Sequence, residues 1–85
     1  MPEISRFMGM IIQMYYEDHS TPHIHVRFAE NRCKIDFYGN LLNGSIPLTK
    51  LHIVKRWTIL HRDELLKDWE KIRKGKLPGR IEPWV

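Results

Sequence analysis

The chain has 85 residues, of which 42% are hydrophobic and 11% aromatic, enough to build one globular domain but too few for a second. Its formal net charge of +4 comes from residues 50–85, with ten basic against five acidic side chains. This balance fits a nucleic-acid or acidic protein partner, or simply a solvated basic helix. The lone Cys33 excludes an internal disulfide and a thiolate metal site, and no apolar run is long enough to cross a membrane. We therefore expect a cytoplasmic protein.

The first half of the chain predicts a small antiparallel sheet over about residues 8–46. Residues 8–16 ("MGMIIQMYY") are rich in branched and aromatic side chains, as in a strand that is buried on much of both faces. Residues 23–28 and 33–38 alternate apolar and polar side chains, and the "AENR" between them predicts the turn of a hairpin. With a further short strand around residues 41–46, we expect three or four strands.

The second half predicts one long helix over about residues 49–74, with a threonine at its start and a glycine after its end. Apolar side chains recur along it at helical spacing, and its length leaves room for a kink near residues 61–63. The tail, residues 76–85, contains two prolines and a glycine and predicts an extended segment. We expect one α+β domain over residues 1–85, with one sheet face packed against the helix.

The predicted strand at residues 23–28 separates apolar from polar side chains. Its apolar side chains are expected to meet the helix, so its polar side chains point away from it. These polar side chains are His23, His25 and Arg27. Because histidine titrates near neutral pH and arginine binds phosphate, this open face is the candidate functional surface.

The register of the predicted hairpin decides which side chain lies opposite each histidine. Matching the apolar faces leaves two registers that differ by two residues. In the first, His25 faces Asp36 and Arg27 faces Lys34. In the second, Arg27 faces Asp36 and His25 faces Tyr38, which replaces a like-charge pair with an opposite-charge pair and is slightly favoured.

The first interpretation of this open face is an RNA-binding site. The residues in contact with RNA would be Arg27, Arg32, Lys34 and Tyr38. His25 and His23, supported by Asp36, would then move protons in a metal-independent ribonuclease reaction that needs no cofactor. If the chain is an enzyme, this is the reaction that we expect.

The second interpretation is a metal site. His23 and His25 are two residues apart on one strand, and His19 in the preceding loop would supply a third ligand. Spacing alone does not provide the outer hydrogen bonds that such a site needs, so no metal is expected. The third interpretation is a solvated face or a contact surface for another protein. Trp84 in the tail also requires a surface to pack on, in its own domain, a partner protein or a second copy of the chain.

Three stretches of the chain resemble a family of small bacterial proteins, domain of unknown function 4160. They are residues 4–28, residues 61–70 ("HRDELLKDWE") and residues 81–83 ("IEP"). The most specific part of the resemblance consists of Asp18, His19, Pro22, His23 and His25, which precede or begin a strand. The chain departs from the family pattern at Thr21, where the family has a second proline, and at Ile24, where it has an aromatic residue. Neither departure removes a reactive group.

The resemblance implies one half of a two-gene module whose other half is another small protein, as in a toxin–antitoxin pair. We therefore expect a toxin-like protein that acts on RNA or on translation, with an antitoxin-like protein as its partner. The alternative is a non-catalytic domain that binds another protein or associates with itself as a homodimer. A histidine-based metal-binding protein is the third alternative.

Overall fold

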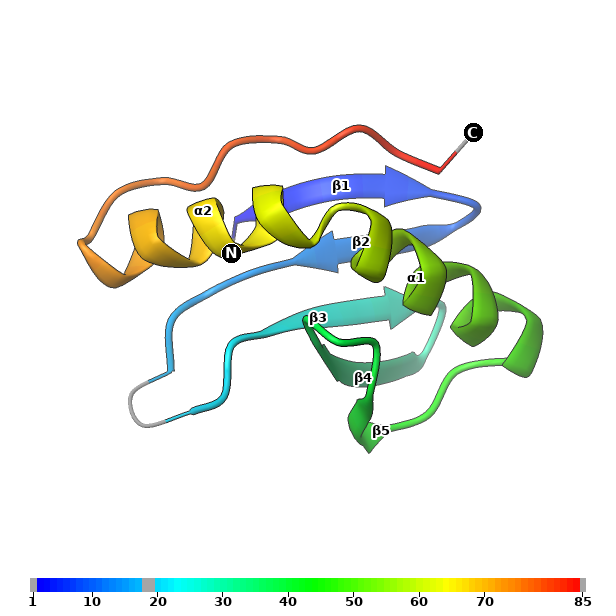
Figure 1. The fold of residues 1–85 in the computed structure, drawn as a ribbon. Helices are drawn as coiled ribbons and strands as arrows, with labels where there is room; N and C mark the ends of the chain where they lie inside the picture. The colour runs from blue at the N-terminus through cyan, green and yellow to red at the C-terminus, as the bar shows by residue number, and fades with distance from the viewer. Residues whose placement is uncertain (1, 18–19, 85) are drawn as a thin grey trace.

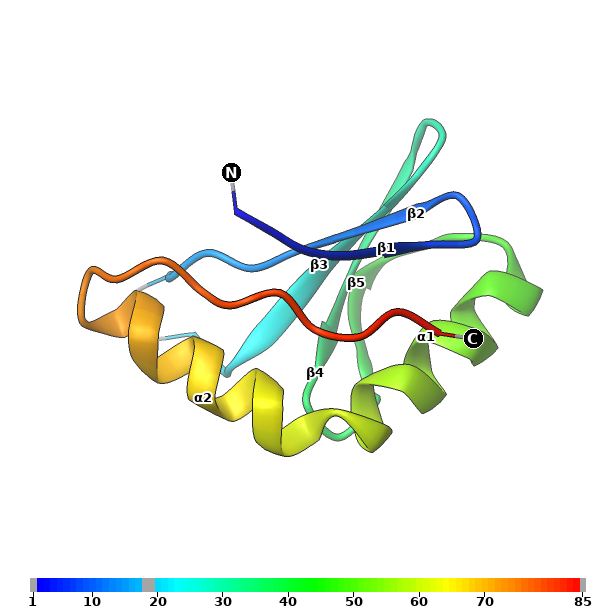
Figure 2. The same ribbon diagram turned by 90° about the horizontal axis from the view of Figure 1, so that it is seen from above.

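The protein is described by a computed structural model over residues 2–17 and 20–84, and it has an α+β fold (Figure 1). Five antiparallel strands form one sheet in the order β1-β2-β3-β4-β5. They are β1 (Glu3–Phe7), β2 (Met10–Gln13), β3 (His23–Phe28), β4 (Asn31–Asp36) and β5 (Leu41–Gly44), followed by the helices α1 (Leu48–Leu60) and α2 (Arg62–Arg73). Figure 2 shows both helices on the same side of the sheet, which leaves the other face without a helix.

The strand predicted over residues 8–16 is wrong in its bounds, because a hairpin turn lies inside that apolar run. Phe7 pairs with Met10 across a two-residue turn at Met8 and Gly9, whose φ angles are 50° and 78°. Glycine adopts this conformation at little steric cost, which suits it to a tight hairpin. The turn separates β1 from β2, so the sheet has five strands where three or four were predicted.

The single helix predicted over residues 49–74 is two helices that meet at His61, whose φ and ψ angles are −102° and 22°. A straight helix over that range would be about 39 Å long. The longest extent of the molecule is 34 Å, so the break keeps both helices on the sheet. In the described part of the chain, neither helix combines the length and the apolar character that crossing a membrane requires.

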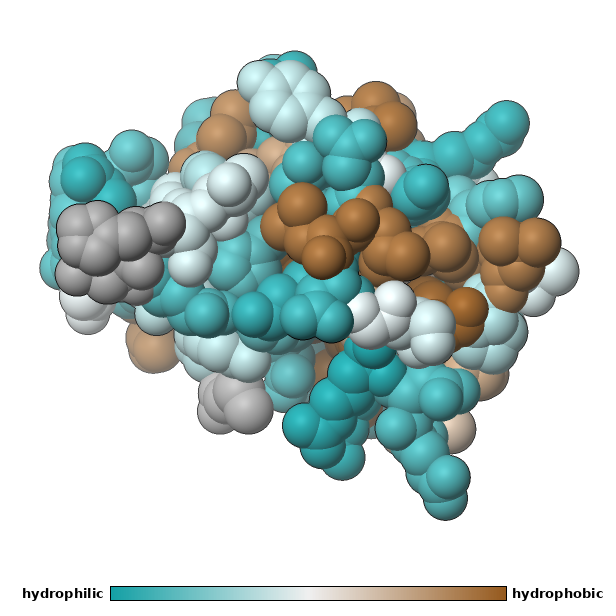
Figure 3. Space-filling model, turned by 90° about the horizontal axis from the view of Figure 1, so that it is seen from below, coloured by the Kyte–Doolittle hydropathy of each residue, from teal (hydrophilic) through white to brown (hydrophobic). Residues whose placement is uncertain are grey.

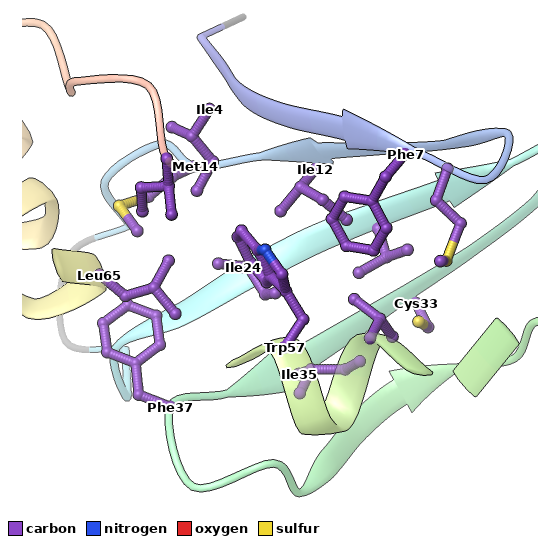
Figure 4. Packing of buried hydrophobic residues seen from close by; sticks show 14 of the residues in the cluster. Ile4, Phe7, Ile12, Met14, Ile24, Cys33, Ile35, Phe37, Trp57 and Leu65 are labelled. Carbon is purple, nitrogen blue, oxygen red and sulfur yellow. The ribbon is translucent and has the colours of Figure 1, made fainter. Parts of the chain in front are cut away.

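The hydrophobic core lies between the helices and one face of the sheet, and Figure 4 shows Trp57 pointing from α1 toward Ile24 of β3. The fully buried side chains include Ile12, Ile24, Val26, Ile35, Val54, Trp57 and Leu65. Burial of the alternate residues of β3 and β4 confirms the apolar face predicted for the hairpin. That packing defines the opposite face of the sheet as the open one.

The C-terminal tail packs against its own domain along the β1 edge. The backbone N–H of Ile81 donates to the carbonyl oxygen of Ile4 at 2.8 Å, and the indole N–H of Trp57 donates to the carbonyl oxygen of Glu82 at 2.8 Å. Trp84 is partly buried against the core. Trp84 therefore finds its packing surface within the chain.

Candidate functional site

A groove of about 550 Å³ runs across the open face of the sheet. Its lining comes from the end of β2, the segment that follows it, β3, β4 and β5. The polar and charged side chains that matter below are Tyr15, Glu17, His25, Arg27, Arg32 and Lys34. On the face that the helices leave open, the groove thus contains one phenol ring, one imidazole ring, one carboxylate and three cations.

The β3–β4 hairpin has a register that differs from both predicted ones. His25 lies opposite Lys34, and Arg27 lies opposite Arg32. The turn consists of only two residues, the first of which, Ala29, has a φ angle of 52°. The second predicted register also has a two-residue turn, so turn length does not separate it from the observed one. In the structure β4 ends at Asp36, whose carboxylate accepts hydrogen bonds from backbone N–H groups of the turn that follows. A preference of a few tenths of a kcal/mol between charged neighbours does not outweigh these contacts.

Both predicted registers are therefore wrong. His25 and Arg27 lie on the open face as predicted. His23, which was predicted to point away from the helix, is instead buried against Trp69 of α2.

Three side chains converge at the start of β3. The Nε2 atom of His23 lies 3.0 Å from Oε1 of Glu17 and 3.1 Å from Nε2 of His25. The Nε2 atom of His25 lies 3.2 Å from the same Glu17 oxygen. His23 is only 2% exposed, because its ring also packs against Trp69 of α2. The described chain thus holds a cluster of two imidazoles and one carboxylate, which we call the Glu17–His23–His25 centre.

The Nδ1 atom of each imidazole in the centre also has a hydrogen-bonding partner. Nδ1 of His23 lies 2.6 Å from the carbonyl oxygen of Thr21. Because a carbonyl only accepts, His23 carries a proton on Nδ1. Nδ1 of His25 lies 3.1 Å from the hydroxyl of Tyr15, whose ring stacks on the imidazole with centroids 4.1 Å apart. These contacts direct both Nε2 atoms toward the carboxylate.

The electrostatics of the centre favour an ionised carboxylate beside a neutral imidazole. The hydrogen bond to His23 and the ammonium of Lys34, which lies 3.6 Å from Oε1, lower the pKa of Glu17 although burial opposes them. Burial, together with the charge of His23, lowers the pKa of His25. An anionic oxygen and a basic nitrogen are therefore available together near neutral pH.

Asp36, which was expected to support the histidines, serves the β4–β5 turn. Its carboxylate accepts hydrogen bonds from the backbone N–H groups of Tyr38 and Asn40 at 2.9 and 2.8 Å, and from the side-chain amide of Asn40 at 3.1 Å. Burial raises the pKa of Asp36, but these hydrogen bonds outweigh it, and the net effect is a lowered pKa. The Cα of Asp36 lies opposite that of His23, yet its carboxylate is engaged elsewhere.

The predicted contact residues fall into two groups. Arg27, Arg32 and Lys34 line the groove. Tyr38 lies outside the groove lining and is 65% exposed, with the guanidinium of Arg62 3.9 Å from the centre of its ring. Trp84 lies beside α1 in a separate hollow, so neither of these aromatic residues belongs to the groove.

The sequence did not lead us to predict a role for Glu17. The predicted third ligand, His19, lies outside the described residues. One signal for Glu17 was present: Gln13 pairs with His25, and Tyr15 and Glu17 follow it at steps of two residues. They therefore share the alternation of the open face. Because β2 ends at Gln13, Glu17 lies beyond the strand, and alternation alone did not predict its position.

Comparison with protein families matches residues 9–70 to a family described as Domain of unknown function (DUF4160). The matched range contains the whole groove and the Glu17–His23–His25 centre. No curated protein matches the chain, and no solved structure does. The match confirms the resemblance noted from the sequence, and the chain belongs to the family described as Domain of unknown function (DUF4160).

Proposed function

We propose that the chain binds single-stranded RNA along the groove and acts on it at the Glu17–His23–His25 centre. In this proposal it is the toxin-like member of a bacterial toxin–antitoxin pair in the cytoplasm. The observation that carries the RNA assignment is the pair of arginines, Arg27 and Arg32, that face each other directly in the groove. The toxin-like role is supported only by the family resemblance to one half of a two-gene module.

The arginine pair is unfavourable without a ligand. Like charges directly opposite each other on neighbouring strands destabilise a sheet. Arg27 and Arg32 are both exposed, and among the described residues neither forms an ion pair with a carboxylate. Lys34 adds a third cation on the same face of β4. A polyanion whose phosphates follow the groove would relieve this repulsion, since neutralising phosphates is the main source of nucleic-acid affinity.

The aromatic lining of the groove favours a single strand. The ring of Tyr15 lines the groove and is partly exposed. Bases that are free of a duplex stack on such rings, and single-stranded RNA is recognised mainly in this way. A strand held between Tyr15 and the two arginines would pass beside His25 and Glu17, which also line the groove.

Fluorescence anisotropy with a labelled single-stranded RNA tests the binding. Arg27→Ala and Arg32→Ala should each weaken binding, and each should reduce the slope of log affinity against log salt by about 0.7 for every phosphate contact that is lost. Lys67→Ala is the matched control, since Lys67 is exposed on α2 and away from the groove. If the control variant lost as much RNA affinity as the groove variants, the RNA would bind outside the groove.

Expression without a partner protein tests the toxin-like role. Bacterial growth should stop and cellular RNA should be degraded, whereas the His25→Ala form should leave both unchanged. Normal growth and intact RNA with the unaltered chain would reject the toxin-like role. That result would not affect the binding assay, which measures the groove directly.

A second candidate function, a protein-interaction domain, is favoured by the β5 edge. All four residues of β5 are exposed, whereas the tail covers the β1 edge. Figure 3 views the molecule from the β5 side and shows apolar side chains gathered on that face, and Leu41 and Leu42 are 40% and 46% exposed. An open edge of this kind can add a strand from a partner or a second copy. Light scattering at rising concentration tests self-association, which Leu42→Lys should abolish; a monomer throughout would reject it.

A further inference from the structure

We propose that Glu17, His23 and His25 together bind one divalent transition-metal ion, with zinc(II) as the representative ion. The inference deepens the proposed function and rests on it only for the molecule on which the ion would act. The sequence led us to expect no metal. Three features of the centre, its shape, its hydrogen atoms and its surroundings, argue for one.

The shape of the centre fits a metal ion. Nε2 of His23, Nε2 of His25 and Oε1 of Glu17 form a nearly equilateral triangle with sides of 3.0, 3.1 and 3.2 Å. Neighbouring ligands of an ion at about 2.1 Å are about 3.0 Å apart in octahedral geometry and about 3.4 Å apart in tetrahedral geometry. The observed sides lie within this interval. An ion above the triangle would reach all three atoms without rearrangement of the backbone.

The hydrogen atoms of the centre do not account for all three contacts. A proton on Nε2 of His23 would bridge to Glu17 and to His25, but His25 and Glu17 would then face each other as two acceptors at 3.2 Å. A proton on Nε2 of His25 would bridge to Glu17 and to His23, but those two would remain acceptors at 3.0 Å. One proton explains two contacts, whereas one metal ion explains three.

The surroundings of the centre are those of a metal site with open positions. The outer nitrogens of the imidazoles lie against the Thr21 carbonyl and the Tyr15 hydroxyl, and such contacts orient metal-binding histidines. The side chain of His23 is 3% exposed and that of Glu17 is 36% exposed, so the centre is closed on one side and open toward the groove. Three protein ligands with an open side leave room for water or a phosphate oxygen. Lys34 competes with the ion for the Glu17 oxygen and should moderate the affinity.

To test the site, the full chain is stripped of metal and titrated with zinc in the absence of RNA, and calorimetry measures the binding. We expect one ion per chain. His25→Ala and the isosteric Glu17→Gln remove a ligand and should weaken zinc binding by more than about 100-fold, whereas Tyr15→Phe keeps the stacked ring, loses the hydroxyl and should weaken it about 10-fold. His52→Ala, which removes an exposed histidine on α1, is the matched control and should bind as the unaltered chain does.

No zinc binding by the unaltered chain, or equal binding by the His25→Ala and His52→Ala forms, would overturn the proposal. Circular dichroism verifies that each variant is folded, and Glu17→Gln changes a loop residue outside the core. Nitrogen-15 NMR gives a second readout: zinc should shift the Nε2 signals of His23 and His25 together, and an imidazolium signal from His23 that zinc leaves unchanged would also overturn the proposal. Failure of zinc binding with intact RNA binding would reject the metal alone, and the opposite result would reject the RNA alone.

Discussion

The two faces of β3 differ in what surrounds alternate residues of the same strand. Ile24 and Val26 are at most 1% exposed beneath the helices, whereas His25 and Arg27 line an open groove. On the helix side, both residues are packed among other apolar side chains of the core. On the open side, two arginines face each other, and His25 meets Glu17 and the buried His23 within hydrogen-bonding distance.

This difference teaches that stability and the ligand binding that we propose reside on opposite sides of one sheet. The buried face contributes free energy of folding through transfer of apolar surface from water. The open face gathers like charges and acceptor atoms that lower stability unless a ligand is bound. Substitutions on the buried face should therefore change stability but not ligand binding, and substitutions on the open face should do the reverse.

The largest expected effect comes from Ile24→Ala. Removing this side chain leaves a cavity beneath Trp57 and should lower the free energy of unfolding by about 2–5 kcal/mol, measured by urea denaturation. The folded fraction should still bind zinc like the unaltered chain. A loss of less than about 1 kcal/mol would show that the helix-covered face does not dominate stability.

The second prediction concerns the thiol of Cys33, on the helix-covered face of β4 opposite Val26. Burial raises the pKa of Cys33 from its ordinary value to about 11. At pH 8 the folded chain should therefore react with a thiol reagent about 100-fold more slowly than the chain unfolded in urea. Equal rates in the two states would contradict burial of this residue.

The third prediction concerns Asp36, at the end of β4. Asp36→Asn removes the charge that the turn donors stabilise and should lower the free energy of unfolding by about 1 kcal/mol at pH 7. Because hydrogen bonds lower the pKa of Asp36 in the folded state, its contribution is present at neutral pH and is lost as the pH falls through that pKa. The difference in Tm from the unaltered chain should shrink below about pH 4.

The control for the Asp36 prediction is Glu30→Gln. Glu30 is exposed in the turn between β3 and β4, and no hydrogen bond holds its carboxylate among the described residues. This variant should change Tm little at any pH. A difference for Asp36→Asn that stayed constant from pH 7 to pH 3 would show that charge is not what the turn stabilises.

The smallest expected effect on stability comes from Arg27→Ala, on the open face. It removes one side of the repulsive pair with Arg32 and should change the free energy of unfolding by less than about 0.5 kcal/mol, in the stabilising direction. Adding Arg32→Ala should bring little further gain, because the repulsion is already gone. Urea denaturation measures both variants. A loss above about 1 kcal/mol would mean that the arginine stem contributes to packing.

The sequence by itself determined the two faces of the hairpin, the α+β class and the extended tail. Alternation of side chains along residues 23–28 is a local property of a strand, so it assigned His25 and Ile24 to opposite faces before any pairing was known. Helical spacing likewise placed Trp57 and Leu65 in the core. These features follow from the geometry of a few consecutive residues.

Only the tertiary structure decided the hairpin register and the approach of Glu17 to the histidines, and it turned the possible kink near residues 61–63 into a break at His61. Cross-strand charges differ by a few tenths of a kcal/mol between registers, too little to outweigh the hydrogen bonds by which Asp36 holds the turn after β4. The rings of Tyr16 and His23 each lie 5.6 Å from that of Trp69 on α2. This packing, between residues far apart in the sequence, holds the segment after β2 beside β3 and so brings Glu17 to the centre.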